Sequence, residues 1–341
     1  MNISADWIKL ISNWFTELRN GFEWQFWYIL FSFIVGTYFF FLNPALVESF
    51  SEQSLIFYFK FSQEIYSPQT NFYAESVLFA WLSFLFGASK HWLFYKIFSS
   101  FLTLLILPTI AYFASKYFDN IWRSWVFILL FVITYRYLWR TYYIGFPDAI
   151  TIICLAAIAL QRRPFIAFLL AVLATVSHFS MALISIGGLI LLIVSTPTML
   201  KKLRLSFVMH LIAGLVVGRL LLAAWFYRFK YSLQTRFDWA IDFGLTGFIS
   251  RYQENISGFW LTPGLMFLIV FGMICIWIFY QRSFMFVFAM VFCLALAYFS
   301  LFVTVDGLRV FAVVISAPYI FMLRAALDAF GHEVKLQEKN Q

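Results

Sequence analysis

The chain has 341 residues, of which 63% are hydrophobic, 23% aromatic and 12% charged, and its mean hydropathy is +0.85. A water-soluble domain of this size would expose large apolar patches, so the composition excludes that class. The formal net charge of +8 arises from 24 basic and 16 acidic residues. We expect the chain to have membrane lipids as partners and to bind no nucleic acid. The sequence predicts an all-α, polytopic integral membrane protein.

The first residues, 1–24, mix Lys, Glu and Arg with Trp and Phe and lack the basic, apolar and small-residue order of a cleavable signal peptide. We interpret them as a cytoplasmic amphipathic segment. The apolar runs that follow reach or approach the roughly 20 residues needed to cross a hydrocarbon core. They predict about ten transmembrane helices, at residues 25–42, 92–115, 123–140, 147–161, 164–178, 180–197, 205–226, 258–280, 284–303 and 308–327.

Basic residues orient the predicted topology. With both termini in the cytoplasm, the turns Gln161–Pro164 and Lys201–Arg204 and most other Lys and Arg residues lie on the cytoplasmic side, as the positive-inside rule requires. Residues 43–91 and 227–257 are then external loops, and both alternate aromatic with polar residues in the manner of interfacial amphipathic helices. We predict a single transmembrane domain over all 341 residues, ending in a cytoplasmic tail at 328–341.

Two segments need a decision about their path. Residues 75–87 are apolar, but they number only 13, and a crossing there would move both basic turns outside, so we place them flat in the outer interface. The short fifth span ends near His178, which is either an outer turn or a break in a helix near the midplane, and both readings stay open. Three cysteines, Cys154, Cys275 and Cys293, fall inside predicted spans, where we expect them to pack.

The order of the elements carries two short motifs. Ala74–Leu78 and Leu85–Gly87 bracket the apolar segment of the first external loop, and Phe146–Ile150 places Pro-Asp-Ala at the start of the fourth span. In this layout and these motifs the chain resembles the GT-C superfamily of membrane glycosyltransferases, over roughly residues 25–165. The resemblance implies transfer of a sugar from a polyprenyl-phosphate-linked donor to a cell-envelope glycan or lipid, on the external side of a bacterial inner (plasma) membrane.

The chain departs from that superfamily at one point. The acidic motif that usually follows the first span has no counterpart, and the nearest carboxylates are Glu48 and Glu52. The chain also resembles the Wzy/EpsG-type polysaccharide polymerases, which place a histidine beyond a basic cytoplasmic turn, as Arg162–Pro164 and His178 do here. This second resemblance implies a polymerase of lipid-linked repeat units. A transporter or flippase, and a non-catalytic scaffold, remain as alternatives from other classes.

Glycosyl transfer from a lipid phosphate needs a carboxylate to take the proton of the acceptor hydroxyl, and cations to stabilise the leaving phosphate. The general-base candidates are acids of the first external loop, namely Glu48, Glu52, Glu64 and Glu75, and the set of catalytic candidates is Glu48, Glu52, Glu75 and Asp148. The candidate substrate-binding residues are mainly arginines with polar neighbours: Arg136, Arg140, His178, Arg219, Arg236, Asp306 and Arg309. Arginine suits this role because a guanidinium can hold a phosphate with two parallel hydrogen bonds.

Most of these residues also have a purely structural interpretation. Asp148 is an acid stabilised at a helix N-terminus, or it contacts the substrate directly, or it pairs with Arg136 or Arg140. Asp306 and Arg309 lie three residues apart, so they either form a salt bridge on one helix face or orient Arg309 toward a lipid phosphate.

His178 and Arg219 lie inside predicted spans. His178 either binds a sugar hydroxyl or phosphate or is a buried neutral imidazole, and we expect Arg219 to face the bundle interior and meet a carboxylate or phosphate. The sequence shows no paired-acid cluster, so we expect no cofactor, and a divalent metal stays open.

Overall fold

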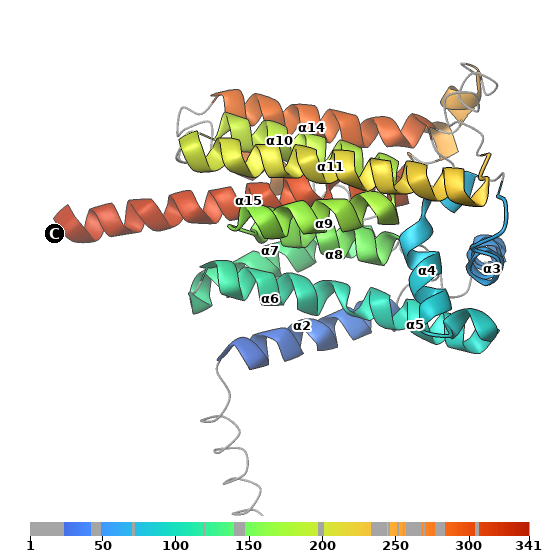
Figure 1. Cartoon of the computed structure of the whole chain (residues 1–341). Helices are drawn as coiled ribbons and strands as arrows, with labels where there is room; N and C mark the ends of the chain where they lie inside the picture. The colour runs from blue at the N-terminus through green and yellow to red at the C-terminus, as the bar shows by residue number, and fades with distance from the viewer. Residues whose placement is uncertain are drawn as a thin grey trace, which may run out of the picture.

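The computed structural model describes residues 24–41, 49–69, 72–118, 120–139, 147–196, 201–232, 244, 246–250, 252–254, 256, 268, 270–276, 284–303 and 307–340. Every regular element among these residues is a helix, and the long helices run side by side as a bundle (Figure 1). The predicted all-α class is therefore confirmed for the described part of the chain.

The described helices match nine of the ten predicted spans, and the predicted span 258–280 lies largely outside the described residues. In chain order they are α2 (Trp24–Phe41), α3 (Ser49–Gln63), α4 (Val77–Leu85), α5 (Trp92–Leu104), α6 (Ile106–Phe118), α7 (Ile121–Trp139), α8 (Asp148–Leu160), α9 (Pro164–Ser177), α10 (Phe179–Ser195), α11 (Lys201–Phe229), α14 (Phe284–Val303) and α15 (Gly307–Asn340). Two short 3₁₀ helices, η2 (Phe72–Glu75) and η3 (Ala88–Lys90), flank α4. The expected tail at 328–341 is largely a continuation of α15, which projects from the bundle (Figure 1).

Several of the described helices are long and apolar enough to cross a membrane. There are five of them: Trp24–Phe41, Trp92–Phe118, Arg204–Phe229, Phe284–Phe302 and Arg309–Asp328. Four shorter apolar helices, of 10 to 17 residues, lie among them in the described residues. The first residue of α2 and the last of α15 lie toward the same end of the bundle (Figure 1). The helices thus indicate a membrane-embedded protein, and the count of ten crossings stays a prediction.

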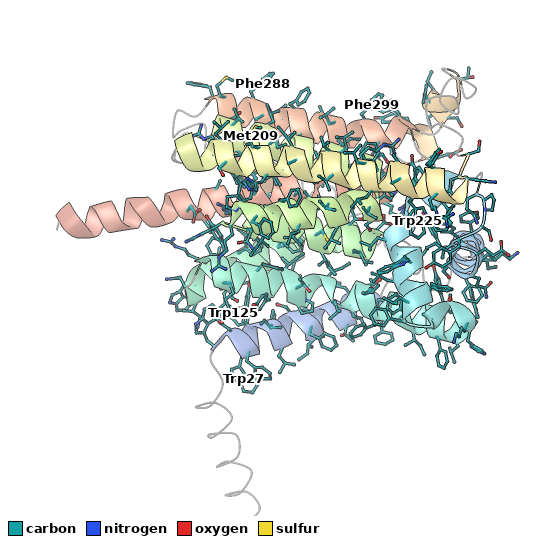
Figure 2. All side chains as sticks on the ribbon, in the orientation of Figure 1. Trp27, Trp125, Met209, Trp225, Phe288 and Phe299 are labelled. Carbon is teal, nitrogen blue, oxygen red and sulfur yellow. The ribbon has the colours of Figure 1, made fainter. Side chains whose placement is uncertain are left out.

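The outer surface of the bundle is apolar. Phe288 and Phe299 on α14 are 67% and 61% exposed, Met209 on α11 is 56% exposed, and all three project from the bundle (Figure 2). Exposed apolar surface costs about 25 cal/mol per Å² in water. A hydrocarbon surrounding removes that cost, so these faces fit lipid chains.

One predicted span, 92–115, is two helices separated at Leu105. Pro108 lacks the amide that would donate to the carbonyl of Leu104, and its ring clashes with that carbonyl, so a continuous helix is disfavoured there. The chain restarts within one residue, as the amide of Thr109 donates to the Leu105 carbonyl at 3.0 Å. The two helices together still supply one apolar segment of 27 residues.

Two helices, α8 and α15, form the centre of the bundle. Every residue of α8 except Ile153 is buried, and α15 is buried over most of Arg309–Asp328. Small side chains at Ala156 and Ala159 let neighbouring helices approach α8 closely. The first turns of these two central helices carry Asp148 and Arg309.

Glycines bring α9 and α11 into close contact. A Cβ on Gly214 would lie 2.7 Å from the Ala171 side chain, and one on Gly218 would lie 2.6 Å from Thr175. Four residues further along α11, from Gly214 to Gly218, the contact on α9 also moves four residues further, from Ala171 to Thr175. Helices α9 and α11 therefore run parallel. Helix α10 connects them and must run in the opposite direction, which means that the chain reverses at His178. The chain therefore turns at His178, and the position of this turn at the outer surface stays a prediction.

Helices α3 and α4 run across the end of the bundle opposite the described termini (Figure 1). Helix α4 has nine residues and is therefore about 13 Å long, too short to cross a hydrocarbon core. It ends shortly before Gly87, whose φ of +70° is the left-handed conformation that glycine adopts without strain. Residues 77–85 thus form a helix too short to span a hydrocarbon core, and the flat position of residues 75–87 in the outer interface stays a prediction.

Candidate functional site

Asp148 and Arg309 form an ion pair in the interior of the bundle. Nη1 of Arg309 donates to Oδ2 of Asp148 at 2.6 Å, and the two residues are 6% and 2% exposed. Asp148 is the first residue of α8, and Arg309 is the third residue of α15. The packing of the two central helices therefore joins residues that are 161 positions apart in the sequence.

The helix dipole acts differently on the two charges. The N-terminus of a helix carries a partial positive charge, which stabilises a carboxylate such as Asp148 and disfavours a cation such as Arg309, each by about 0.3–1 kcal/mol. Arg309 is therefore held at the start of α15 by its contact with Asp148 and against the local helix dipole.

A small polar layer surrounds the start of α8. The hydroxyls of Thr151 and Ser177 lie 2.9 Å apart, and each lies 3.2 Å from the carbonyl oxygen of Pro147, which accepts from them. These contacts fix the residue before Asp148 to the end of α9. They also place His178, which follows Ser177 and is 3% exposed, at the same level of the bundle as the ion pair.

Helix α11 extends beyond the level of the ion pair. Helices α8 and α9, with 13 and 14 residues, are only about 20 Å long, against a hydrocarbon core of about 30 Å. Helix α11 continues for 11 residues beyond Gly218, its contact point near the end of α9, which adds about 16 Å. Asp148 and His178 therefore lie well below the end of α11.

Glu75 lies at the same end of the molecule. It is the last residue of η2, is half-buried, and directly precedes Ser76 and α4. Helix α4 packs against α3 and α9, so Glu75 lies at the end of the bundle at which α8 begins. Of the four catalytic candidates, Glu75 and Asp148 are those whose side chains the structure describes.

The structure corrects the expectation for Arg219. Its side chain is exposed rather than interior, and its guanidinium lies 4.6 Å from the ring centroid of Phe179. The buried stripe of α11 includes Leu215, Gly218 and Leu222, and Arg219 flanks this stripe. The contact with Phe179 is a cation–π interaction at the start of α10, and the expected contact of Arg219 with a phosphate stays a prediction.

The remaining candidates lie wholly or partly outside the described residues. Glu48, Arg140, Arg236 and Asp306 are outside them, and for Glu52 in α3 and Arg136 in α7 the backbone alone is described. The expected pairing of Arg309 with Asp306 therefore has no test here. In the structure Arg309 pairs with Asp148. The sequence had suggested Arg136 or Arg140 as the partner of Asp148.

A second polar cluster, which sequence reasoning missed, lies at the opposite end of the bundle. Arg324 is 7% exposed, its Nη1 donates to the carbonyl of Ala159 at 2.7 Å, and its guanidinium lies 4.0 Å from the centroid of the Tyr117 ring. The Tyr117 hydroxyl donates to Asp328 at 2.6 Å, and the guanidinium of Arg162 lies 4.3 Å from the same ring. These contacts connect α6, α8 and α15 and indicate a structural role. The only sequence signal was an arginine beyond the predicted midplane of the last span.

The potential metal ligands and the cysteines lie apart from one another. In the described part of the chain no three His, Cys, Asp or Glu residues group as a metal site would require. Cys154 and Cys293 are buried free thiols, and Sγ of Cys293 lies 3.4 Å from the carbonyl oxygen of Gly188. The packing role expected for Cys293 is confirmed by this contact between α14 and α10.

Comparison of the chain with protein-family models, with curated proteins and with solved structures gives no match in any of the three.

Proposed function

We propose that the chain is a membrane glycosyltransferase that moves a sugar from a polyprenyl-phosphate-linked donor to a cell-envelope glycan or lipid. The observation that carries the proposal is the buried ion pair of Asp148 and Arg309. A buried pair is weak in stabilising a fold, because desolvation of two charges cancels most of their attraction. Ionisable residues at membrane depth are therefore associated with a substrate or ion pathway.

A lipid phosphate fits the position and charge of Arg309. In this proposal the chain crosses the membrane ten times with cytoplasmic termini, and α3 and α4 lie in the outer interface. The polyprenyl chain of the donor occupies the bilayer beside the bundle, and its phosphate reaches the level of α8 and α15. There Arg309 binds the phosphate with charge-assisted hydrogen bonds, while Asp148 orients the guanidinium.

The reaction assigns one step to each group. The hydroxyl oxygen of the acceptor attacks the anomeric carbon of the donor sugar, and its proton passes to the carboxylate of Glu75. The bond between the anomeric carbon and the phosphate oxygen breaks, and the negative charge that develops on the polyprenyl phosphate is stabilised by Arg309. Glu75 suits the proton transfer because its half-buried position beside an apolar helix limits the water that would compete with the acceptor hydroxyl.

A polymerase of lipid-linked repeat units is the second candidate. It is favoured by His178, which is buried at the level of Asp148 and directly follows Ser177, a hydrogen-bonding neighbour of Pro147. Such an enzyme would use the same arginine for the leaving lipid phosphate, and would accommodate a second lipid-linked chain as the acceptor.

Binding of undecaprenyl phosphate to the purified protein in detergent tests the proposal. We expect saturable binding by the wild type, and affinity at least about tenfold lower in the Arg309→Gln variant, since a charge-assisted hydrogen bond contributes about 1.5–3 kcal/mol. The Asp148→Asn/Arg309→Gln double variant lacks both charges of the pair and should also bind weakly while remaining folded. Arg163→Gln, an exposed cation before α9, is the matched control and should bind as the wild type does.

Two results would overturn the proposal. One is a well-folded wild-type protein that shows no saturable binding of undecaprenyl phosphate. The other is a double variant that binds the lipid with wild-type affinity, because the ion pair would then have no part in phosphate recognition.

A further inference from the structure

A cavity with basic and aromatic walls lies at the end of α11. It is an open hollow of about 580 Å³, lined by Phe226, Tyr227, Arg228, Lys230 and Tyr231, and its volume is within the range of small-molecule sites. Two of these five residues are cations, and none is acidic. The cavity is remote from Arg309, because α11 rises for 11 residues beyond its contact with α9.

The end of α11 is shaped by an unusual residue. The amide of Tyr231 donates to the carbonyl of Phe226 at 2.9 Å, and the amide of Lys230 donates to that of Tyr227 at 3.4 Å. These two bonds form a Schellman motif, completed by the stacked rings of Phe226 and Tyr231 at 5.5 Å. The residue after the helix in this motif is left-handed and is usually glycine, yet here it is Lys230, with φ +56°.

A lysine in this conformation is strained, because its Cβ crowds the following carbonyl oxygen. Strained residues persist where the surrounding structure holds them, and they cluster at ligand-binding sites. Arg228 needs no such explanation, since a cation in the last turn of a helix is favoured by the helix dipole. The Schellman motif accounts for the left-handed conformation of Lys230, and the two cations that line the cavity without an acidic residue are the observation that points to an anionic ligand.

The surrounding structure holds the cavity wall in place. The hydroxyl of Tyr231 donates to the carbonyl of Ile65, and the amide of Ser232 donates to the carbonyl of Gln69 at 2.8 Å. Burial raises the pKa of the Tyr231 phenol, so it remains a neutral donor. The segment after α3 thereby fixes the backbone that turns Lys230 into the cavity.

From this geometry we propose that the cavity binds the phosphate group of a lipid headgroup. The apolar part of α11 ends at Phe229, so the cavity lies at the depth where headgroup phosphates are found. The helix end contributes about half a negative charge, which the two full positive charges of Arg228 and Lys230 outweigh. The aromatic side chains flank the glycerol or isoprenoid part of the lipid. The inference does not depend on glycosyl transfer at Arg309.

The test uses opposite effects of one substitution on folding and on binding. Lys230→Gly removes the cation and the strain together, so we expect the melting temperature to rise by about 2 °C and the affinity for dioctanoyl phosphatidic acid to fall about tenfold. Lys230→Asn, which also tolerates the left-handed conformation, should lose affinity equally. The binding is measured on the full chain in detergent, with dioctanoyl phosphatidylcholine as the reference lipid.

Each outcome decides one question. Preference for phosphatidic acid that millimolar inorganic phosphate does not abolish identifies a lipid headgroup as the ligand. If inorganic phosphate itself binds and displaces the lipid, the phosphate site stands, but its ligand is soluble. Equal affinity for the two lipids, or unchanged phosphatidic acid binding in both Lys230 variants, overturns the inference and leaves Arg228 and Lys230 as anchors at the membrane boundary. Neither result changes the expected effect of Arg309→Gln on undecaprenyl phosphate.

Discussion

Replacing Arg309 by glutamine removes the cation that faces the buried carboxylate of Asp148. The two charged groups are 2.6 Å apart, and their side chains are 8% and 2% exposed. Removing one partner of such a buried pair lowers the free energy of unfolding by about 3–5 kcal/mol, whereas an exposed pair contributes about 0–1 kcal/mol. In a chain of this size 1 kcal/mol shifts the melting temperature by about 2 °C. We therefore expect a decrease of about 6–10 °C for Arg309→Gln, and a similar decrease for Asp148→Asn.

The Asp148→Asn/Arg309→Gln double variant separates a charge effect from a packing effect. Neither introduced amide side chain is charged, so the desolvation cost disappears with the attraction, and the net loss should be about 1 kcal/mol, or about 2 °C. The assay is thermal unfolding in detergent, followed by the monodisperse fraction that remains after heating. Arg163→Gln is the control and should stay within about 0.5 kcal/mol of the wild type.

Two results would refute this reasoning. Single variants that melt within about 1 °C of the wild type would show that water reaches the pair and screens it. A double variant whose decrease equals the sum of the two single decreases would show that Asp148 and Arg309 act independently, in contradiction to the geometry.

Two further predictions concern packing. Gly218→Ala places a Cβ 2.6 Å from Thr175 and should lower the free energy of unfolding by about 1–3 kcal/mol. In the control variant Gly187→Ala the new Cβ meets nothing within 4 Å, so the melting temperature should be unchanged or slightly higher. Equal effects of the two substitutions would contradict the close approach of α9 and α11. Arg324→Lys keeps the charge but loses the planar contact with the Tyr117 ring, which is 4.0 Å away, and should lower the free energy of unfolding by about 1–3 kcal/mol. A melting temperature equal to that of the wild type would show that this contact is not stabilising.

Local sequence was sufficient to locate the helices. In a membrane each segment must satisfy its backbone hydrogen bonds internally, so an apolar run of sufficient length becomes a helix wherever it occurs. This explains why the span predicted at 284–303 coincides with α14. The break at Leu105 could also have been found, because Pro108 disrupts a helix by local geometry.

The partners of the charged residues depended on tertiary structure. Hydropathy gives the depth of a residue but not the direction in which its side chain points around the helix axis, so Arg219 was placed inside the bundle although it is exposed. Arg324, which looked like an ordinary boundary arginine, is buried because α6 and α8 pack around it.

The sequence by itself determined that this is an all-helical membrane protein, and it determined which residues could carry charge at membrane depth. Only the tertiary structure decided that Asp148 meets Arg309, because that contact requires α8 and α15 to pack side by side at the centre of the bundle. Such packing depends on small residues and shape complementarity over several helices together, and no single segment contains that information.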